Sequence, residues 1–100
     1  MATYLVFHNR IHDVKQMQEY LSKALPTLTP YKHEILVADG NSQVIEGKTA
    51  LPRTVVVKFD SREIALAWYN SPEYQTVLPL RLEATEGYAV LVDGLVRPLS

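Results

Sequence analysis

Four short runs of β-branched and aromatic residues predict four strands. They cover residues 3–9 (TYLVFHN), 33–39 (HEILVAD), 53–60 (RTVVVKFD) and 87–94 (GYAVLVDG). Turn residues follow the second run, and QVIEG beyond them is interpreted as an extension of that strand or a hook at its end. The glycines are all expected at strand ends, where turns form: Gly40, Gly47, Gly87 and Gly94.

Apolar residues spaced three and four apart predict a helix over residues 13–25. Asp13 is expected to cap its N-terminus, and a proline follows its last residue. A second helix is expected to begin at Asp60, because Asp60 and Glu63 resemble a capping box. It should stop near Asn70, since the residue before a proline disfavours the helical conformation.

The stretch AWYNSPEYQ interrupts this second helix and gathers three large aromatic residues around Asn-Ser-Pro. Ser71 is expected to cap a new helix, with Pro72 at its first position, where a missing N–H has no consequence. The stretch is therefore predicted to join two helices. Pro79 should kink or split the second of them, because it has no N–H to donate to Gln75.

The resulting order of elements, β-α-β-β-α-β, predicts an α+β protein with the ferredoxin-like fold. Its four strands form an antiparallel sheet, and both helical segments cover one face of that sheet. A chain of 100 residues without repeats or a linker is expected to form a single domain. We place this domain at residues 1–96 and a C-terminal tail at residues 97–100.

Alternation within the strands predicts that both faces of the sheet are apolar. The larger side chains should face the helices: Leu5, Phe7, Val55, Val57 and Phe59. The other face still carries Tyr4, Val6, Leu36, Val56 and one side of the last strand. Antiparallel sheets commonly present a polar face to water, so this second apolar face is expected to be covered.

We predict that a second copy of the chain covers this face. Burying about six side chains per subunit gives at most on the order of 20–35 kcal/mol for two subunits. Association costs roughly 4–15 kcal/mol in lost freedom and side-chain ordering. Burial exceeds that cost, which predicts a homodimer through the open sheet face, closed or nearly closed into a dimeric α/β barrel. The alternative is a monomer with a mildly apolar open face.

Composition and charge exclude several classes of function. The net charge of −1 argues against nucleic-acid binding, which needs a basic surface. Without cysteine, the chain has no disulfide, no thiolate nucleophile and no zinc–cysteine site. The first residues resemble neither a signal peptide nor a membrane span, so we expect a cytoplasmic protein that has no membrane partner. No metal-ligand spacing, phosphate loop or nucleophile elbow is found, so no metal and no cofactor are expected.

The most specific group of candidate site residues consists of His8, Glu34 and Lys58. The first and third strands are expected to run parallel and the second antiparallel, which brings the three residues to one end of the sheet. There they would lie on the dimer-facing side with Tyr4, with His8 as a general base, Lys58 as an anion anchor and Glu34 as an orienting group. The structural alternative, which we favour, is a cross-strand ion pair of Glu34 with Lys58 beside His8.

The aromatic cluster and one arginine are further candidates for ligand contact. Trp68 lies on the apolar stripe of its helix and is expected in the core. Tyr69 and Tyr74 are expected to lean over a pocket between helix and sheet, although packing is the favoured role of the cluster. Arg81 could clamp a carboxylate or, the favoured alternative, pair with Glu73 or Glu83.

The stretch VVVKFDSREIALAWYNSPEYQTVLPLR closely resembles the signature of the DUF1330 family, a domain of unknown function in the dimeric α/β-barrel superfamily. YLVFHNRIHDVKQMQEY and VLVDG also match, so the resemblance covers nearly the whole chain. It implies the ferredoxin-like dimeric barrel and no established activity. Related superfamily members include cofactor-free monooxygenases, lactone isomerases and haem-handling enzymes, which suggests a pocket for a small aromatic or polyketide-like molecule.

The chain departs from the pattern of that family at four positions. Arginines are frequent in the second strand of the family, where this chain has Glu34 and Ala38, and glutamate is frequent in the third strand, where it has Lys58. One pair of charges is therefore reversed. A tyrosine common in the first helix is replaced by Met17. A ligand that depended on the family's arginines would not be bound in the same way.

Two hypotheses of function follow. The first is a cofactor-independent enzyme or binder that acts on a small aromatic or carboxylate metabolite. The second is a non-catalytic dimeric binding or interaction module. An enzyme needs a titratable group inside a closed pocket, so the positions of His8, Lys58 and Arg81 discriminate between them.

Overall fold

The computed structural model describes residues 1–48 and 51–95. The elements in chain order are β1 (Thr3–Ile11), α1 (Val14–Ala24), the short 3₁₀ helix η1 (Leu25–Leu28), β2 (His33–Asp39), β3 (Arg53–Phe59), α2 (Arg62–Tyr69), α3 (Pro72–Ala84) and β4 (Thr85–Asp93). The C-terminal tail expected at residues 97–100 lies outside the described residues. No helix in the described part of the chain is long and apolar enough to cross a membrane.

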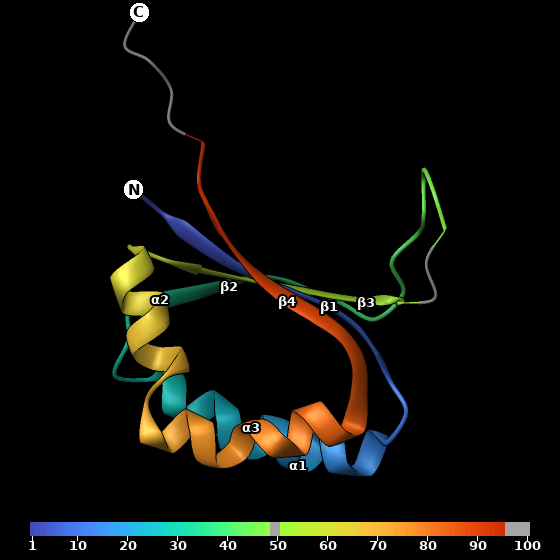
Figure 1. Ribbon diagram of the computed structural model, residues 1–100, viewed down its shortest axis with the longest axis horizontal. Coiled ribbons are helices and arrows are strands. Elements are labelled where there is room, and N and C mark those ends of the chain that lie inside the picture. Colours follow the sequence, from blue (N-terminus) through green and yellow to red (C-terminus); the bar gives the residue numbers. More distant parts are fainter. Residues whose placement is uncertain (49–50, 96–100) are drawn as a thin grey trace, which may run out of the picture.

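The four strands form one sheet in the order β2-β3-β1-β4, and every neighbouring pair is antiparallel. All the helices lie on one side of the sheet, with α2 standing at one end and α1 and α3 side by side beneath it (Figure 1). The sheet is open and not closed on itself. The predicted α+β ferredoxin-like fold is therefore confirmed.

The expected parallel arrangement of the first and third strands is wrong. β1 pairs with β3 in antiparallel register, Thr3 opposite Phe59 and Asn9 opposite Arg53. The reason is the connectivity: the crossover through α1 returns β2 parallel to β1, and the chain then reverses direction between β2 and β3. Positions late in β1 consequently lie beside positions early in β3.

The core lies between the helices and the inner face of the sheet. Leu5 and Phe7 of β1 are buried there with Val57 and Phe59 of β3, as alternation predicts. The helices contribute the other buried side chains: Met17, Tyr20, Ala24, Leu28, Ala65, Trp68, Tyr74, Val77, Leu78 and Ala84. Large apolar side chains from every layer therefore share one core.

Two of the three helix caps are those predicted. Asp13 and Ser71 each accept a hydrogen bond from the backbone N–H three residues on, at 3.0 and 3.2 Å. Helix α2 is capped by Ser61 and not by Asp60, as the Ser61 hydroxyl accepts the corresponding N–H at 3.2 Å. Asp60 instead forms a surface ion pair with Lys32, Nζ to Oδ2 3.1 Å.

Three other local predictions are wrong in whole or in part. Helix α3 is not split at Pro79, because its buried side chains pack it against α1 and outweigh one missing backbone hydrogen bond. QVIEG does not extend β2 as a strand, and it lies in the loop after β2, which projects past the sheet (Figure 1). Gly87 lies inside β4 and not at its end, with φ +139°.

The outer face of the sheet carries a row of four valines, one from each strand. Val6 of β1 lies opposite Val56 of β3 and Val90 of β4, and Val56 lies opposite Val37 of β2. Simple alternation had predicted Leu36 at this place. A register shift between Ile35 and Val37 puts Val37 there instead. The described residues leave this apolar row uncovered.

Candidate functional site

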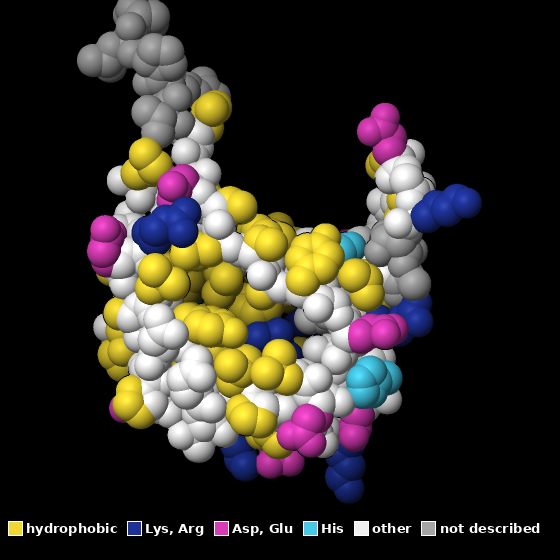
Figure 2. All heavy atoms as spheres, viewed as in Figure 1, with side chains coloured by type: hydrophobic (Ala, Val, Ile, Leu, Met, Phe, Trp, Pro, Cys, Tyr) yellow, Lys and Arg dark blue, Asp and Glu magenta, His cyan; other side chains and the backbone are white. Residues whose placement is uncertain are grey.

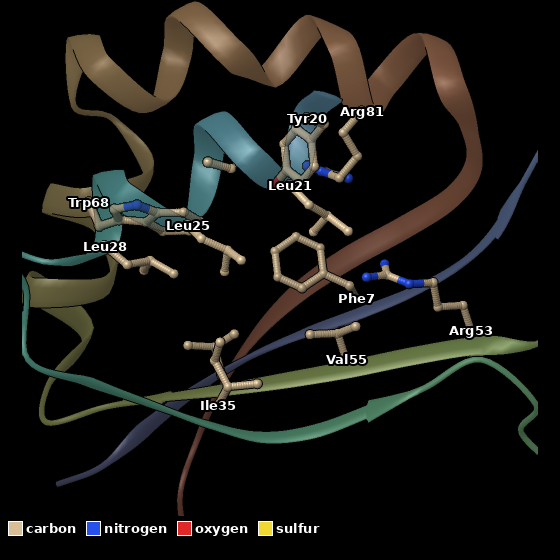
Figure 3. A pocket seen from close by; sticks show the side chains of 12 residues that line it. Phe7, Tyr20, Leu21, Leu25, Leu28, Ile35, Arg53, Val55, Trp68 and Arg81 are labelled. Carbon is tan, nitrogen blue, oxygen red and sulfur yellow. The ribbon is translucent and has the colours of Figure 1, made fainter. Parts of the chain in front are cut away.

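An apolar pocket lies between the helices and the inner face of the sheet. Its walls come from α1 and η1 on one side and from the strands on the other (Figure 3). The apolar lining includes Phe7, Leu21, Leu28, Ile35, Val55 and Trp68. The cavity measures about 60 Å³, several times the space that one water molecule needs.

One end of this pocket opens to solvent. Leu25 and Ile35, which both line it, are 48% and 44% exposed. Seen from the side of β4 and α3, the molecule is also hollowed between the sheet and the helices, with hydrophobic side chains around a cationic side chain in the depth (Figure 2). A small molecule therefore has an entry beside Leu25 and Ile35.

The opposite end of the pocket is cationic. Arg53 from β3 and Arg81 from α3 both reach the space beside Phe7 (Figure 3). Arg81 is only 6% exposed, and its guanidinium carbon lies 4.9 Å from the centre of the Phe7 ring and 5.9 Å from that of Tyr20. Its buried Nε has no hydrogen-bond partner among the described residues.

Neither arginine has an acidic partner among the residues that the structure describes. The ion pairs found among the described residues involve other cations, all at the surface. Burial lowers the pKa of Arg53, and the nearby Arg81 lowers it further. Burial also acts to lower the pKa of Arg81, but the neighbouring Tyr74 and Tyr20 hydroxyls outweigh it and raise that pKa. Both guanidinium groups are charged at neutral pH, so the end of the pocket carries two uncompensated positive charges.

Asn9 adds an unsatisfied amide to this end of the molecule. It is 1% exposed, and neither its Oδ1 nor its Nδ2 has a hydrogen-bond partner among the described residues. Asn9 lies directly opposite Arg53 in the register, on the same inner face of the sheet. A buried amide without partners is rare in native structures, although Asn9 does not itself line the pocket.

Tyr20 supplies a neutral hydroxyl to the pocket wall. Its hydroxyl oxygen lies 2.7 Å from that of Tyr74, which is fully buried. Burial raises the pKa of Tyr20, and its hydrogen bond with Tyr74 adds to the effect. The phenol is therefore protonated at neutral pH and is no general base.

The group of His8, Glu34 and Lys58 predicted from the sequence is not brought together. Lys58 lies opposite Glu34 and Tyr4, whereas His8 lies opposite Thr54, with Nδ1 to Oγ1 3.3 Å. The two rows are four residues apart along β1, which corresponds to about 13 Å. The cause is the antiparallel pairing of β1 and β3. All of these residues lie on the outer face, away from the pocket.

The favoured ion pairs of the sequence analysis are also not formed. Glu34 and Lys58 face each other in the register, but no ion pair joins them in the described structure. Arg81 likewise pairs with neither Glu73 nor Glu83. Its side chain turns inward from α3 to the core, so it is a pocket residue.

The aromatic cluster of Trp68, Tyr69 and Tyr74 mainly packs the protein, which is the role that the sequence favoured over ligand contact. Trp68 is 2% exposed, stacks on Phe59 at 5.9 Å between ring centres and donates its Nε1–H to Thr27 at 2.9 Å. Tyr74 is buried against Trp68, at 4.0 Å, and does not line the pocket. Tyr69 lines a separate groove between α2 and β4. Of the cluster, only Trp68 reaches the pocket.

Sequence reasoning missed Tyr20, Arg53 and Asn9. For two of them a signal was present in the strand pattern. The alternation that turns Phe7 and Val55 inward also turns Asn9 and Arg53 inward, so each is a polar residue at a core position. Tyr20 gives no such signal, because a tyrosine on the apolar face of a helix is ordinary.

The pattern of one family, described as a domain of unknown function (DUF1330), matches residues 2–95. The chain belongs to the DUF1330 family. This membership confirms the resemblance found in the sequence, and it assigns the DUF1330 protein no activity. Comparison with functionally curated proteins gives no match.

Solved structures similar to the DUF1330 protein share its fold. A protein of unknown function from Rhodopseudomonas palustris superposes with a TM-score of 0.81 at 10% identity, over 96% of this chain and 84% of that one. A dimeric ferredoxin-like protein of unknown function from Jannaschia sp. CCS1 gives 0.66 at 16% identity, over 96% and 100%. SnoaB, a cofactor-independent oxygenase from Streptomyces nogalater, gives 0.64 at 7% identity, over 96% and 95%. At these identities the likeness concerns the fold alone.

Proposed function

We propose that this DUF1330 protein binds a small molecule with an apolar body in the pocket between its helices and its sheet. The observation that carries this proposal is the cavity itself, apolar along its length, cationic at its inner end and open beside Leu25 and Ile35. Ligand pockets are typically apolar with a few convergent polar groups. A similar fold is found in SnoaB, which is a cofactor-independent oxygenase.

Binding is favoured over acid–base catalysis by the side chains around the cavity. The titratable groups among the lining residues are Tyr20, Arg53 and Arg81. None of them exchanges a proton near neutral pH, because the arginines stay charged and burial raises the pKa of Tyr20. The one weak candidate for catalysis, His8, lies on the outer face of the sheet.

The binding test uses the intrinsic fluorescence of Trp68, the one tryptophan of the chain, which lines the pocket. Titration with 3-phenylpropionamide and 3-phenylpropionate is expected to change its emission saturably. Val55→Phe fills the cavity and should weaken binding of both probes by about tenfold or more. Val14→Phe, the same change at an exposed position of α1, should leave binding unaltered. If neither probe saturates, or if Val55→Phe binds as the wild type does, the pocket is no ligand site.

We also propose a homodimer through the outer face of the sheet. On β4, Tyr88 is 54% exposed, and Val90 and Val92 are each 42% exposed on the same face. The loop after β2 projects beyond this face and carries Ile45, which is 83% exposed (Figure 1). Exposed apolar patches of this kind mark protein–protein contacts. The structurally similar ferredoxin-like protein from Jannaschia sp. CCS1 is dimeric.

The dimer is tested by changing one member of the valine row. Val90→Asp places a charge in the proposed interface and is expected to convert a species of twice 11.3 kDa to one of 11.3 kDa in light scattering. Leu82→Asp is the matched control, because Leu82 is 58% exposed on α3, away from the sheet. A wild-type protein of 11.3 kDa at micromolar concentration, or a Val90→Asp variant that stays dimeric, would exclude this interface.

Three expectations from the sequence stay predictions. They are a cytoplasmic location, a single domain over residues 1–96 and a function without a cofactor. Each is proposed from composition and pattern, including the net charge of −1 and the lack of cysteine.

A further inference from the structure

We infer that the cationic end of the pocket is a site for one carboxylate group, so that the ligand is a small apolar or aromatic carboxylate. This inference rests on the proposed function, that the pocket binds a small molecule. It starts from Arg53 and Arg81, which approach the same end of the cavity without an acidic partner in the described structure.

Arg81 is buried and Arg53 is half-buried, so the two like charges beside each other disfavour the empty protein. A buried charge without a partner is costly, and the repulsion between two like charges adds to that cost. Burial lowers the pKa of Arg53, and the charge of Arg81, which lines the same end of the pocket, also acts to lower it. An anion between them would reduce both penalties, and the described part of the chain supplies none there.

Hydrogen-bonding groups without partners lie near this end of the pocket. The Nε of Arg81, a pocket residue, is buried and has no partner among the described residues. Both polar atoms of the Asn9 amide are also buried and unpartnered in the described structure, and Asn9, which does not itself line the pocket, lies opposite Arg53 on the inner face. The Arg81 Nε and the Asn9 Nδ2 are donors, so this end of the protein has unused donor capacity.

A carboxylate fits this set of groups best. It is planar, singly charged and able to accept paired hydrogen bonds from a guanidinium group. From this end, the apolar walls of Phe7, Val55 and Leu28 lead to the open mouth, so the body of the ligand would point outward (Figure 3).

The experiment compares 3-phenylpropionate with its neutral amide, which has nearly the same shape. The full-length protein is expected to bind the carboxylate about tenfold or more tightly, as a charge-assisted contact contributes at least that much. Arg53→Met and Arg81→Met should each reduce this preference to within about twofold. Arg62→Met, which removes a surface arginine paired with Asp93 outside the pocket, should keep it.

Asn9→Asp is a second, independent variant. It places a carboxylate of the chain itself opposite Arg53 without a change in size. We expect the preference for the carboxylate probe to be lost, because the new carboxylate competes for the arginines. Arg53→Met guards against loss of folding in Arg81→Met, because Arg53 is only half-buried.

The outcomes separate the inference from the proposed function. If the amide and the carboxylate bind equally to the wild type, the carboxylate site is wrong while the small-molecule pocket stands. If neither probe binds, the proposed function fails as well. Retention of the preference in Arg53→Met and in Asn9→Asp would overturn the assignment, as would tighter competition by inorganic phosphate than by acetate.

Discussion

Replacement of Gly87 by alanine is expected to lower the free energy of unfolding by about 2–6 kcal/mol. A Cβ atom at this position would overlap the carbonyl oxygen of His8 and lie 2.7 Å from the Cα of Asn9. These are backbone atoms of β1, a central strand, so no side-chain rotation relieves the overlap. The φ of +139° adds strain, because it lies in a region that residues with a Cβ rarely adopt.

Urea denaturation followed by circular dichroism measures this loss. Gly40→Ala is the matched control, since a Cβ there meets no atom within 4 Å, and its effect should stay within about 0.5 kcal/mol. The total stability of a domain is only about 5–15 kcal/mol, so Gly87→Ala is expected to be partly unfolded near body temperature. Equal stability of the two alanine variants would show that β4 can move away from β1.

The second large effect is expected for Trp68→Ala, at about 3–5 kcal/mol. Trp68 is 2% exposed and lies between Phe59 of β3 and Tyr74 of α3, so it joins α2 to both layers of the core. Alanine would leave a cavity bounded by these two rings. It would also remove the hydrogen bond that the Thr27 hydroxyl accepts from Nε1 at 2.9 Å, while that hydroxyl still donates to the carbonyl of Ala24.

Two further variants separate packing from hydrogen bonding. Trp68→Phe retains an aromatic ring but loses the bond to Thr27, and a loss of about 1–2 kcal/mol is expected. Leu66→Ala on the same helix should cost about 1 kcal/mol or less, because Leu66 is 42% exposed. Unfolding is followed by circular dichroism, since both Trp68 variants remove the fluorescent residue. A Trp68→Ala variant as stable as Leu66→Ala would contradict a core role.

Much of the fold could be predicted because the relevant signals are local. The run HEILVAD gives β2 with its observed bounds, and Ser71-Pro72 begins α3 as expected. Alternation in β1 and β3 correctly assigns Leu5, Phe7, Val57 and Phe59 to the core. Each of these depends on residues a few positions apart, whose backbone preferences and burial act together.

The candidate site was less predictable, because it depends on which strand positions become neighbours. His8 and Lys58 were expected together and lie in separate rows, since that depends on the relative direction of β1 and β3. Arg81 was identified as a candidate ligand-binding residue. Arg53, which lines the same pocket, was not identified, because it comes from a strand 28 positions earlier in the chain. The shift at Leu36 and the continuity of α3 through Pro79 likewise depend on contacts between elements.

The sequence by itself determined the order of strands and helices, the apolar faces of each and the family to which the chain belongs. Propensity, capping and periodicity act within a few residues and need no knowledge of the fold. Only the tertiary structure decided that Arg53 and Arg81 lie at one end of an apolar cavity, with Asn9 opposite Arg53, and that Gly87 must remain without a side chain. These facts arise from antiparallel register and from the packing of α3 on α1, which join residues far apart in the chain.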